Sequence, residues 1–167
     1  QFGAALALFS RESQFQSPDQ ALPALSRLRQ MSSSLGEAEP LAGLNLVVAR
    51  LEACRGHCVN ARRHLEISRR LLALRPHPGM ASATELVDAG LEMYGGNLNR
   101  ASRAARSGNK QAKAAGLNIA LAGSLTNLGL MLLFRGHHAR AKECLDGVLA
   151  SIDGLLLVKL SALDSLA

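Results

Sequence analysis

The chain has 167 residues, 19 Lys and Arg against 13 Asp and Glu, a net charge of +6, and only 3% aromatic residues. Strong helix formers dominate while Val, Ile, Thr and aromatic residues are scarce, which weighs against a β-rich fold and predicts an all-α protein with one sizeable core. The three cysteines have no disulfide-framework spacing, so we expect a reducing compartment and a cytoplasmic protein.

Helical periodicity predicts pairs of helices, each pair joined by a tight turn and followed by a longer connection. The first unit covers about 1–37, and its SSSLGE segment at 32–37 is expected to be a connecting loop. The second unit, 38–79, ends in RPHPG, and the third and fourth cover 80–116 and 117–153. An extra helix is expected at 154–167, and apolar helical sequence at both ends suggests a fragment of a longer protein.

Small and apolar residues recur every 40 positions, which is the signature of a helical repeat array. A glycine at the turn allows a left-handed backbone, and an alanine early in the second helix lets two helix axes cross closely. A further apolar residue follows the alanine by four positions, and a fourth column, small in units two to four and Phe in unit one, precedes the glycine slot by seven (Gln16 fills that slot in unit one). The columns are Gly56, Gly96 and Gly136; Ala21, Ala61, Ala101 and Ala141; Leu25, Leu65, Ala105 and Leu145; and Phe9, Ala49, Ala89 and Gly129.

These columns resemble the tetratricopeptide repeat, most closely at 126–150, where Leu128-Gly129, Gly136 and Ala141 occupy the family's slots. The resemblance implies a right-handed α-solenoid of antiparallel helix pairs, with four repeats plus one extra helix. The step of 40 exceeds the family's usual length of about 34. Longer, aromatic-poor units are similar to the sensor arrays of large bacterial transcription regulators such as LuxR-type ATP-dependent activators. That similarity implies a non-catalytic protein-interaction or ligand-sensing module of a transcriptional or signalling regulator.

The family's inward-facing positions, carried over to this sequence, imply a concave surface for a protein or peptide partner, or for a small-molecule inducer. The partner-contacting residues expected there are Arg50, Met93, Tyr94, Leu130 and Phe134. The same apolar positions can instead pack helix against helix. Burial of both Tyr94 and Phe134 would remove the main residues of this surface.

The basic residues make nucleic-acid binding the runner-up function. They lie on the second helices of units two and three: Arg62, Arg63, Arg69, Arg70, Arg100, Arg103, Arg106, Lys110 and Lys113. A solvated face explains them more simply, because no aromatic stacking residues stand between them, so nucleic acid is not the expected partner. Self-association as a homodimer through the apolar terminal helices is a third candidate function.

Other chemistry-bearing residues fit ordinary roles. Cys54, His57, Cys58 and His64 are metal-ligand types, but they fall in packing columns of the repeat, so no metal site is predicted. The uncharged segment 114–134 is interrupted by polar residues and glycine, and we do not expect it to span a membrane. Because no catalytic or phosphate-binding motif is present, neither an enzyme nor a cofactor is predicted.

Overall fold

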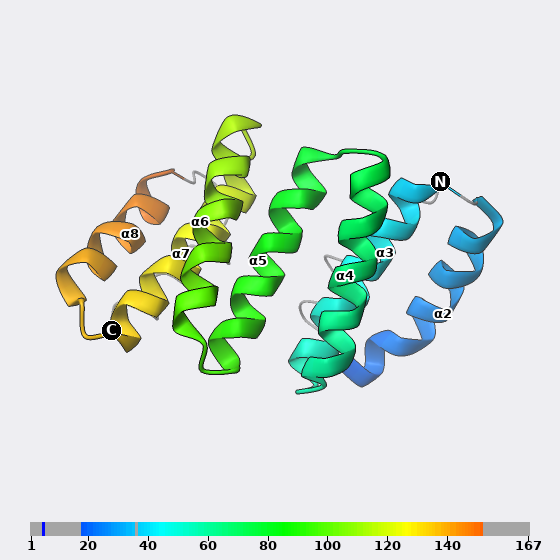
Figure 1. Cartoon of the computed structure of the whole chain (residues 1–167), viewed down its shortest axis with the longest axis horizontal. Helices are drawn as coiled ribbons and strands as arrows, with labels where there is room; N and C mark the ends of the chain where they lie inside the picture. Colours follow the sequence, from blue (N-terminus) through cyan, green and yellow to red (C-terminus); the bar gives the residue numbers. More distant parts are fainter. Residues whose placement is uncertain (1–4, 6–17, 36, 152–167) are drawn as a thin grey trace. The chain divides into compact units, whose positions relative to one another are not determined.

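The computed structural model describes residue 5, residues 18–35 and residues 37–151. Within these ranges the chain forms helices and no strand, which confirms the all-α prediction. The helices are α2 (Pro18–Leu35), α3 (Ala38–Cys54), α4 (Cys58–Leu74), α5 (Pro78–Tyr94), α6 (Leu98–Ala114), α7 (Asn118–Phe134) and α8 (His138–Ser151) (Figure 1). The helix predicted at 154–167 and the apolar stretch at 2–9 lie outside this described part.

The helices form two compact units, residues 1–80 and 81–167. In the first unit α2 packs against α3, and α3 against α4; in the second, α6 packs against α7, and α7 against α8. Helix α5 joins the second unit through Ser82, whose hydroxyl donates a hydrogen bond to the carbonyl of Gly108 at 3.0 Å. Within each unit, neighbouring helices in the chain run in opposite directions (Figure 1).

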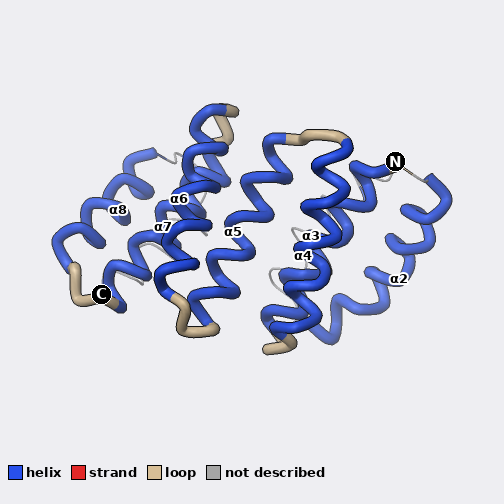
Figure 2. The backbone as a smooth tube through the Cα atoms, in the orientation of Figure 1, coloured by secondary structure: helices blue, strands red, loops and turns tan. Residues whose placement is uncertain are grey.

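The connections between α3 and α8 are all equally short. Each helix from α3 onward begins 20 residues after the one before, and three-residue turns at 55–57, 75–77, 95–97, 115–117 and 135–137 join them (Figure 2). The longer connections expected between helix pairs were therefore a wrong prediction. The SSSLGE loop was wrong as well, because Ser32–Leu35 complete α2, where the Ser32 hydroxyl donates to the carbonyl of Arg29 at 2.9 Å.

Glycine with a left-handed backbone closes four of the five turns: Gly56, Gly96, Gly116 and Gly136 have φ between +66° and +76°. In the first of them His57 N–H donates to Glu52 O at 2.9 Å and Gly56 N–H to Ala53 O at 3.0 Å, which is the Schellman pattern of helix ends. The turn at 75–77 has no glycine. There Arg75 is extended (φ −139°, ψ 95°), because the ring of the following Pro76 disfavours a helical conformation.

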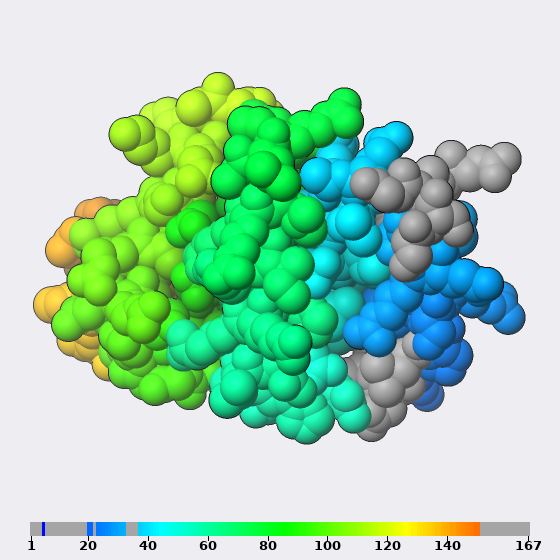
Figure 3. Space-filling model, turned by 45° about the vertical axis from the view of Figure 1, so that its right-hand side comes forward, coloured from blue at the N-terminus to red at the C-terminus, as the bar shows by residue number. Residues whose placement is uncertain are grey.

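The repeat columns are the core. Ala21, Ala61, Ala101 and Ala141 are fully buried, each in the fourth position of α2, α4, α6 and α8. The next column, Leu25, Leu65, Ala105 and Leu145, is buried too, and Leu145 lies against Gly129 on the preceding helix. A Cβ atom on Gly129 would lie 2.8 Å from Leu145 Cγ, so glycine makes the room that this leucine occupies. The opposite face of α6 stays at the surface, where its residues are drawn in yellow-green (Figure 3).

Candidate interaction surface

Two aromatic side chains are exposed at the ends of α5 and α7 in the second unit. Tyr94 is the last residue of α5 and is 78% exposed; Phe134 is the last residue of α7 and is 66% exposed. They are 40 positions apart, each two residues before a left-handed glycine, so the repeat places them in the same slot. The condition that would have removed the predicted surface, burial of both rings between helices, is not met.

Helices α5 and α7 run in the same direction (Figure 1). The Asn127 amide donates to the carbonyl of Leu86 at 3.3 Å, and a Cβ atom on Gly123 would lie 2.9 Å from Leu86 Cδ2. Contacts this close place the helix axes within about 8–10 Å of each other. The rings of Tyr94 and Phe134 therefore project from the same end of two adjacent helices.

Each aromatic residue shares its helix face with the residue four positions earlier. On α7 this is the half-buried Leu130; on α5 it is Gly90, around whose Cβ position no other atom lies within 4 Å. We call Gly90, Tyr94, Leu130 and Phe134 the aromatic face. The remaining predicted residue of this unit, Met93, turns partly inward and packs against the core cluster that contains Ala89 and Met131.

Arg50 lies in the first unit, on α3, and is half-buried. Burial lowers the pKa of its guanidinium below the ordinary value, and the charge of Cys54 partly offsets this effect. Thr126, four residues before Leu130 on α7, is buried, and its hydroxyl donates to the carbonyl of Ala122 at 3.0 Å. The expected surface thus reduces, in the second unit, to the aromatic face and the edge of Met93.

Polar contacts fix the end of the unit that carries the aromatic rings. Arg135, directly after Phe134, donates to the side-chain oxygen of Asn99 at the start of α6. The Arg100 guanidinium lies 3.8 Å from the carboxylate of Glu92, whose side chain is only 1% exposed. These contacts join the start of α6 to the turn at 135–137 and to the last turn of α5, so the helix ends that carry the two rings are linked to each other.

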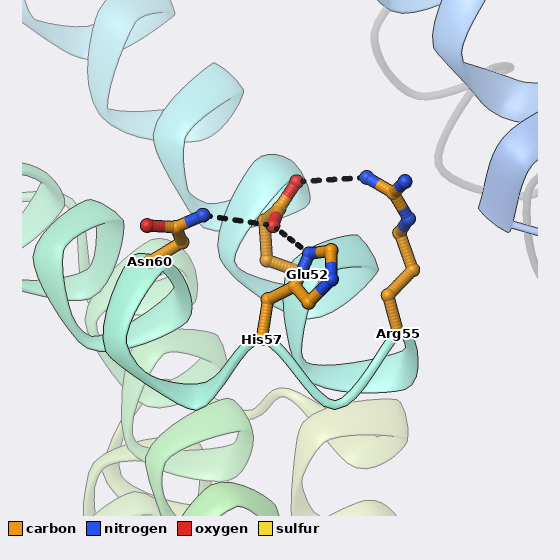
Figure 4. A network of polar contacts seen from close by, with 4 residues as sticks. All are labelled: Glu52, Arg55, His57 and Asn60. Atoms are coloured by element: carbon orange, nitrogen blue, oxygen red, sulfur yellow. Dashed lines mark hydrogen bonds and ion pairs between the residues drawn. The ribbon is translucent and has the colours of Figure 1, made fainter.

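The first unit carries a polar network at its corresponding turn. Glu52 accepts a hydrogen bond from His57 (2.9 Å) and one from Asn60 (3.4 Å), and its other oxygen lies 3.4 Å from Arg55 (Figure 4). Burial on its own raises the pKa of the Glu52 carboxyl, but the two hydrogen bonds and the charges of His57 and Arg55 outweigh it. The pKa therefore lies below the ordinary value of a glutamate.

The metal-ligand residue types of this region have separate partners. His57 bonds to Glu52, while His64 Nδ1 lies 2.8 Å from Asn45 Oδ1, and Cys54 is exposed. In the described ranges no three His, Cys, Asp or Glu side chains come together as metal ligands. A shallow, open depression of about 330 Å³ follows the turn itself, lined by Gly56, His57, Cys58, Val59 and Asn60.

None of the helices described has both the length and the apolar composition needed to cross a membrane. In α7, the core of the uncharged segment, Ala122, Ser124 and Gly129 are buried against neighbouring helices. The self-association surface predicted for the terminal helices falls on residues outside the described ranges. No protein-family model matches the sequence, and no curated protein sequence matches it.

From the sequence, the basic residues were assigned equally to the helices α4 and α6. The sequence analysis did not predict that the exposed cations gather on α6. All five cations of α6 are exposed, whereas Arg69 on α4 is half-buried and Arg70 pairs with Glu66 at 3.0 Å. The spacing of 3, 3, 4 and 3 residues along α6 was the available signal.

Proposed function

We propose that this chain is a non-catalytic interaction module of a larger cytoplasmic, bacterial-type regulator, and that its aromatic face binds an apolar or amphipathic peptide segment of a protein partner. In this proposal the helix pairs continue into a right-handed superhelix similar to that of tetratricopeptide repeats. Partner binding biases the relative positions of neighbouring pairs, which relays the bound state to a domain beyond this sequence.

The observation that supports the proposal most is the pair of exposed rings of Tyr94 and Phe134 in equivalent slots. The chain contains only five aromatic residues, one Tyr and four Phe, and this face carries two of them at the surface. Covering one such side chain contributes about 1.5–3 kcal/mol, and aromatic residues are enriched among binding hot spots. The space around Gly90 leaves room beside Tyr94 for an inserted apolar side chain.

A display library of amphipathic helical peptides, selected against the whole chain, tests this function. We expect selected peptides to lose about tenfold or more in affinity for the double variant Tyr94→Ala and Phe134→Ala. The matched control removes two equally exposed apolar side chains from the first unit, Val59→Ala and Leu74→Ala, and should leave affinity unchanged. Backbone amide shifts on binding should centre on residues 90–97 and 130–137.

Equal loss in both double variants, or shifts centred on another surface, would contradict the proposal. Circular dichroism checks that both variants keep their helical content. Because all four side chains are more than 60% exposed, their removal leaves no cavity in the core.

A further inference from the structure

Helix α6 has one exposed face made of cations. It carries five basic and no acidic residues over its 17 positions. Every basic side chain on it is exposed, and we call the set the cationic face: Arg100, Arg103, Arg106, Lys110 and Lys113. The helix's other side is held in the core by small buried residues, among them Ala101, Ala105 and Ala112.

Four of these cations make no ion pair within 4 Å with a carboxylate of the residues that the structure describes. Only Arg100 approaches a carboxylate, that of Glu92 at 3.8 Å. With 100° per residue, Arg103, Arg106, Lys110 and Lys113 fall within an arc of about 80°, along about 15 Å of the helix axis. Gathering four like charges on one strip is unfavourable in the isolated protein. The negative charges of a bound polyanion offset this repulsion, and release of its condensed counterions favours binding further.

We propose that the cationic face of α6 binds the phosphate backbone of double-stranded nucleic acid without reading its base sequence. This is a second activity, at a different site from the aromatic face. The length of the strip matches about four successive phosphates of one strand at about 3.4 Å of axial rise each.

The composition of the face favours a duplex over other polyanions. Single-stranded nucleic acid is held by aromatic side chains on which bases stack, and α6 contains no aromatic residue. Protein interfaces are built around buried apolar anchors, and none of the large hydrophobic residues exposed in the described ranges lies on α6. Membrane-surface helices insert an apolar face, whereas the non-basic side of α6 is committed to the core.

Fluorescence anisotropy of a labelled 20-base-pair duplex, titrated with the whole chain at several salt concentrations, tests the proposal. Four neutralised phosphates give a slope of log K against log salt of about −3.6, so raising salt from 50 to 200 mM weakens binding about 150-fold. A variant that replaces four cations by glutamine should have a shallower slope, between about −1 and 0. Its substitutions are Arg103→Gln, Arg106→Gln, Lys110→Gln and Lys113→Gln. Replacing the two arginines by lysine should keep the slope, since it counts charges.

The matched control removes four exposed arginines from other helices: Arg27→Gln, Arg63→Gln, Arg70→Gln and Arg140→Gln. It lowers the net charge equally and should keep the steep slope. If it lowers the slope as much as the α6 variant does, binding follows net charge and the assignment to α6 is overturned. A wild-type slope shallower than about −2, or displacement by polyglutamate or phosphatidylserine vesicles at equal charge concentration, overturns it as well.

Discussion

Two glycines six residues apart should respond in opposite directions to the same substitution. Gly90 lies inside α5, and Gly96 closes the turn after it with φ +76°. At both positions no atom lies within 4 Å of an added Cβ, so steric clash contributes nothing at either site. The change to alanine therefore isolates backbone conformation alone.

The expected magnitudes follow from that difference. Alanine in a left-handed conformation costs about 1–2 kcal/mol, of which the lower entropy of the unfolded chain returns roughly 0.4–1. Taking the central values, Gly96→Ala should thus destabilise the second unit by about 0.8 kcal/mol. Gly90→Ala should stabilise it by about 0.5–1 kcal/mol, because glycine is unfavourable inside a helix. Gly96→Asn should cost less than Gly96→Ala, since asparagine tolerates this conformation better.

Guanidinium unfolding followed by tyrosine fluorescence measures these changes. The chain has a single Tyr and no Trp, and Tyr94 lies between the two glycines, so the signal reports this part of the second unit. A shift of 1 kcal/mol corresponds to about 2–4 °C in melting temperature for a chain of this size. A Gly96→Ala protein as stable as wild type, or stability changes of the same sign at both positions, would refute the assigned turn.

Three further changes test other parts of the structure. Gly129→Ala should destabilise the folded chain by about 1–3 kcal/mol, because the new Cβ would overlap Leu145. In a double-mutant cycle, the same substitution made in the Leu145→Ala background should cost much less. The folded state depresses the pKa of Glu52, so between the folded and unfolded pKa values the unfolded chain binds more protons. In urea unfolding, the excess stability of wild type over Glu52→Gln should therefore begin to fall below about pH 4.3 and vanish once the pH is below the folded pKa. Burial, then the charges of Arg29 and Arg63, lower the pKa of His64, so its imidazole NMR titration should have a midpoint below about 6.5. As the pH falls from about 6.5 towards that midpoint, wild type should lose stability, and His64→Gln should not show this loss.

The repeat columns predicted the core because small residues leave a strong signal where helices cross. Alanine at the fourth position of a helix is required only if another helix approaches closely, and all four column alanines are indeed fully buried. The glycines were equally informative, since a left-handed turn tolerates few other residues. Gly56, Gly96 and Gly136 have the φ values that this argument requires.

The connections were predicted wrongly because the step of 20 was hidden in the step of 40. Gly116 stands midway between Gly96 and Gly136 and closes the same type of turn. The position 40 residues before Gly116 is Pro76 and not a glycine. Proline reaches an equally short turn by holding Arg75 extended. One non-glycine turn was enough to make the sequence look like pairs of helices with long connections.

The surface was harder to predict than the core, because a position in a repeat gives the face of a helix but not its neighbours. Thr126 is buried, and its hydroxyl accepts burial at little cost because it donates to the carbonyl of Ala122 within its own helix. The exposure of Tyr94 and Phe134 depends on how much of each neighbouring helix end covers them, which periodicity does not report. Likewise, the cysteines and histidines around Gly56 have metal-binding chemistry, but geometry gives each histidine a different partner.

The uniform three-residue turns have a consequence for how specificity can evolve here. Between Ala38 and Ser151 no connection is long enough to fold over a helix, so none can act as a lid, a finger or a hypervariable binding loop. Within 38–151, any binding surface is therefore built from side chains on helices and three-residue turns, where one substitution changes one contact and leaves the scaffold intact. Over this range a designed binding specificity would be built by substitution on helix faces and not by grafting a loop.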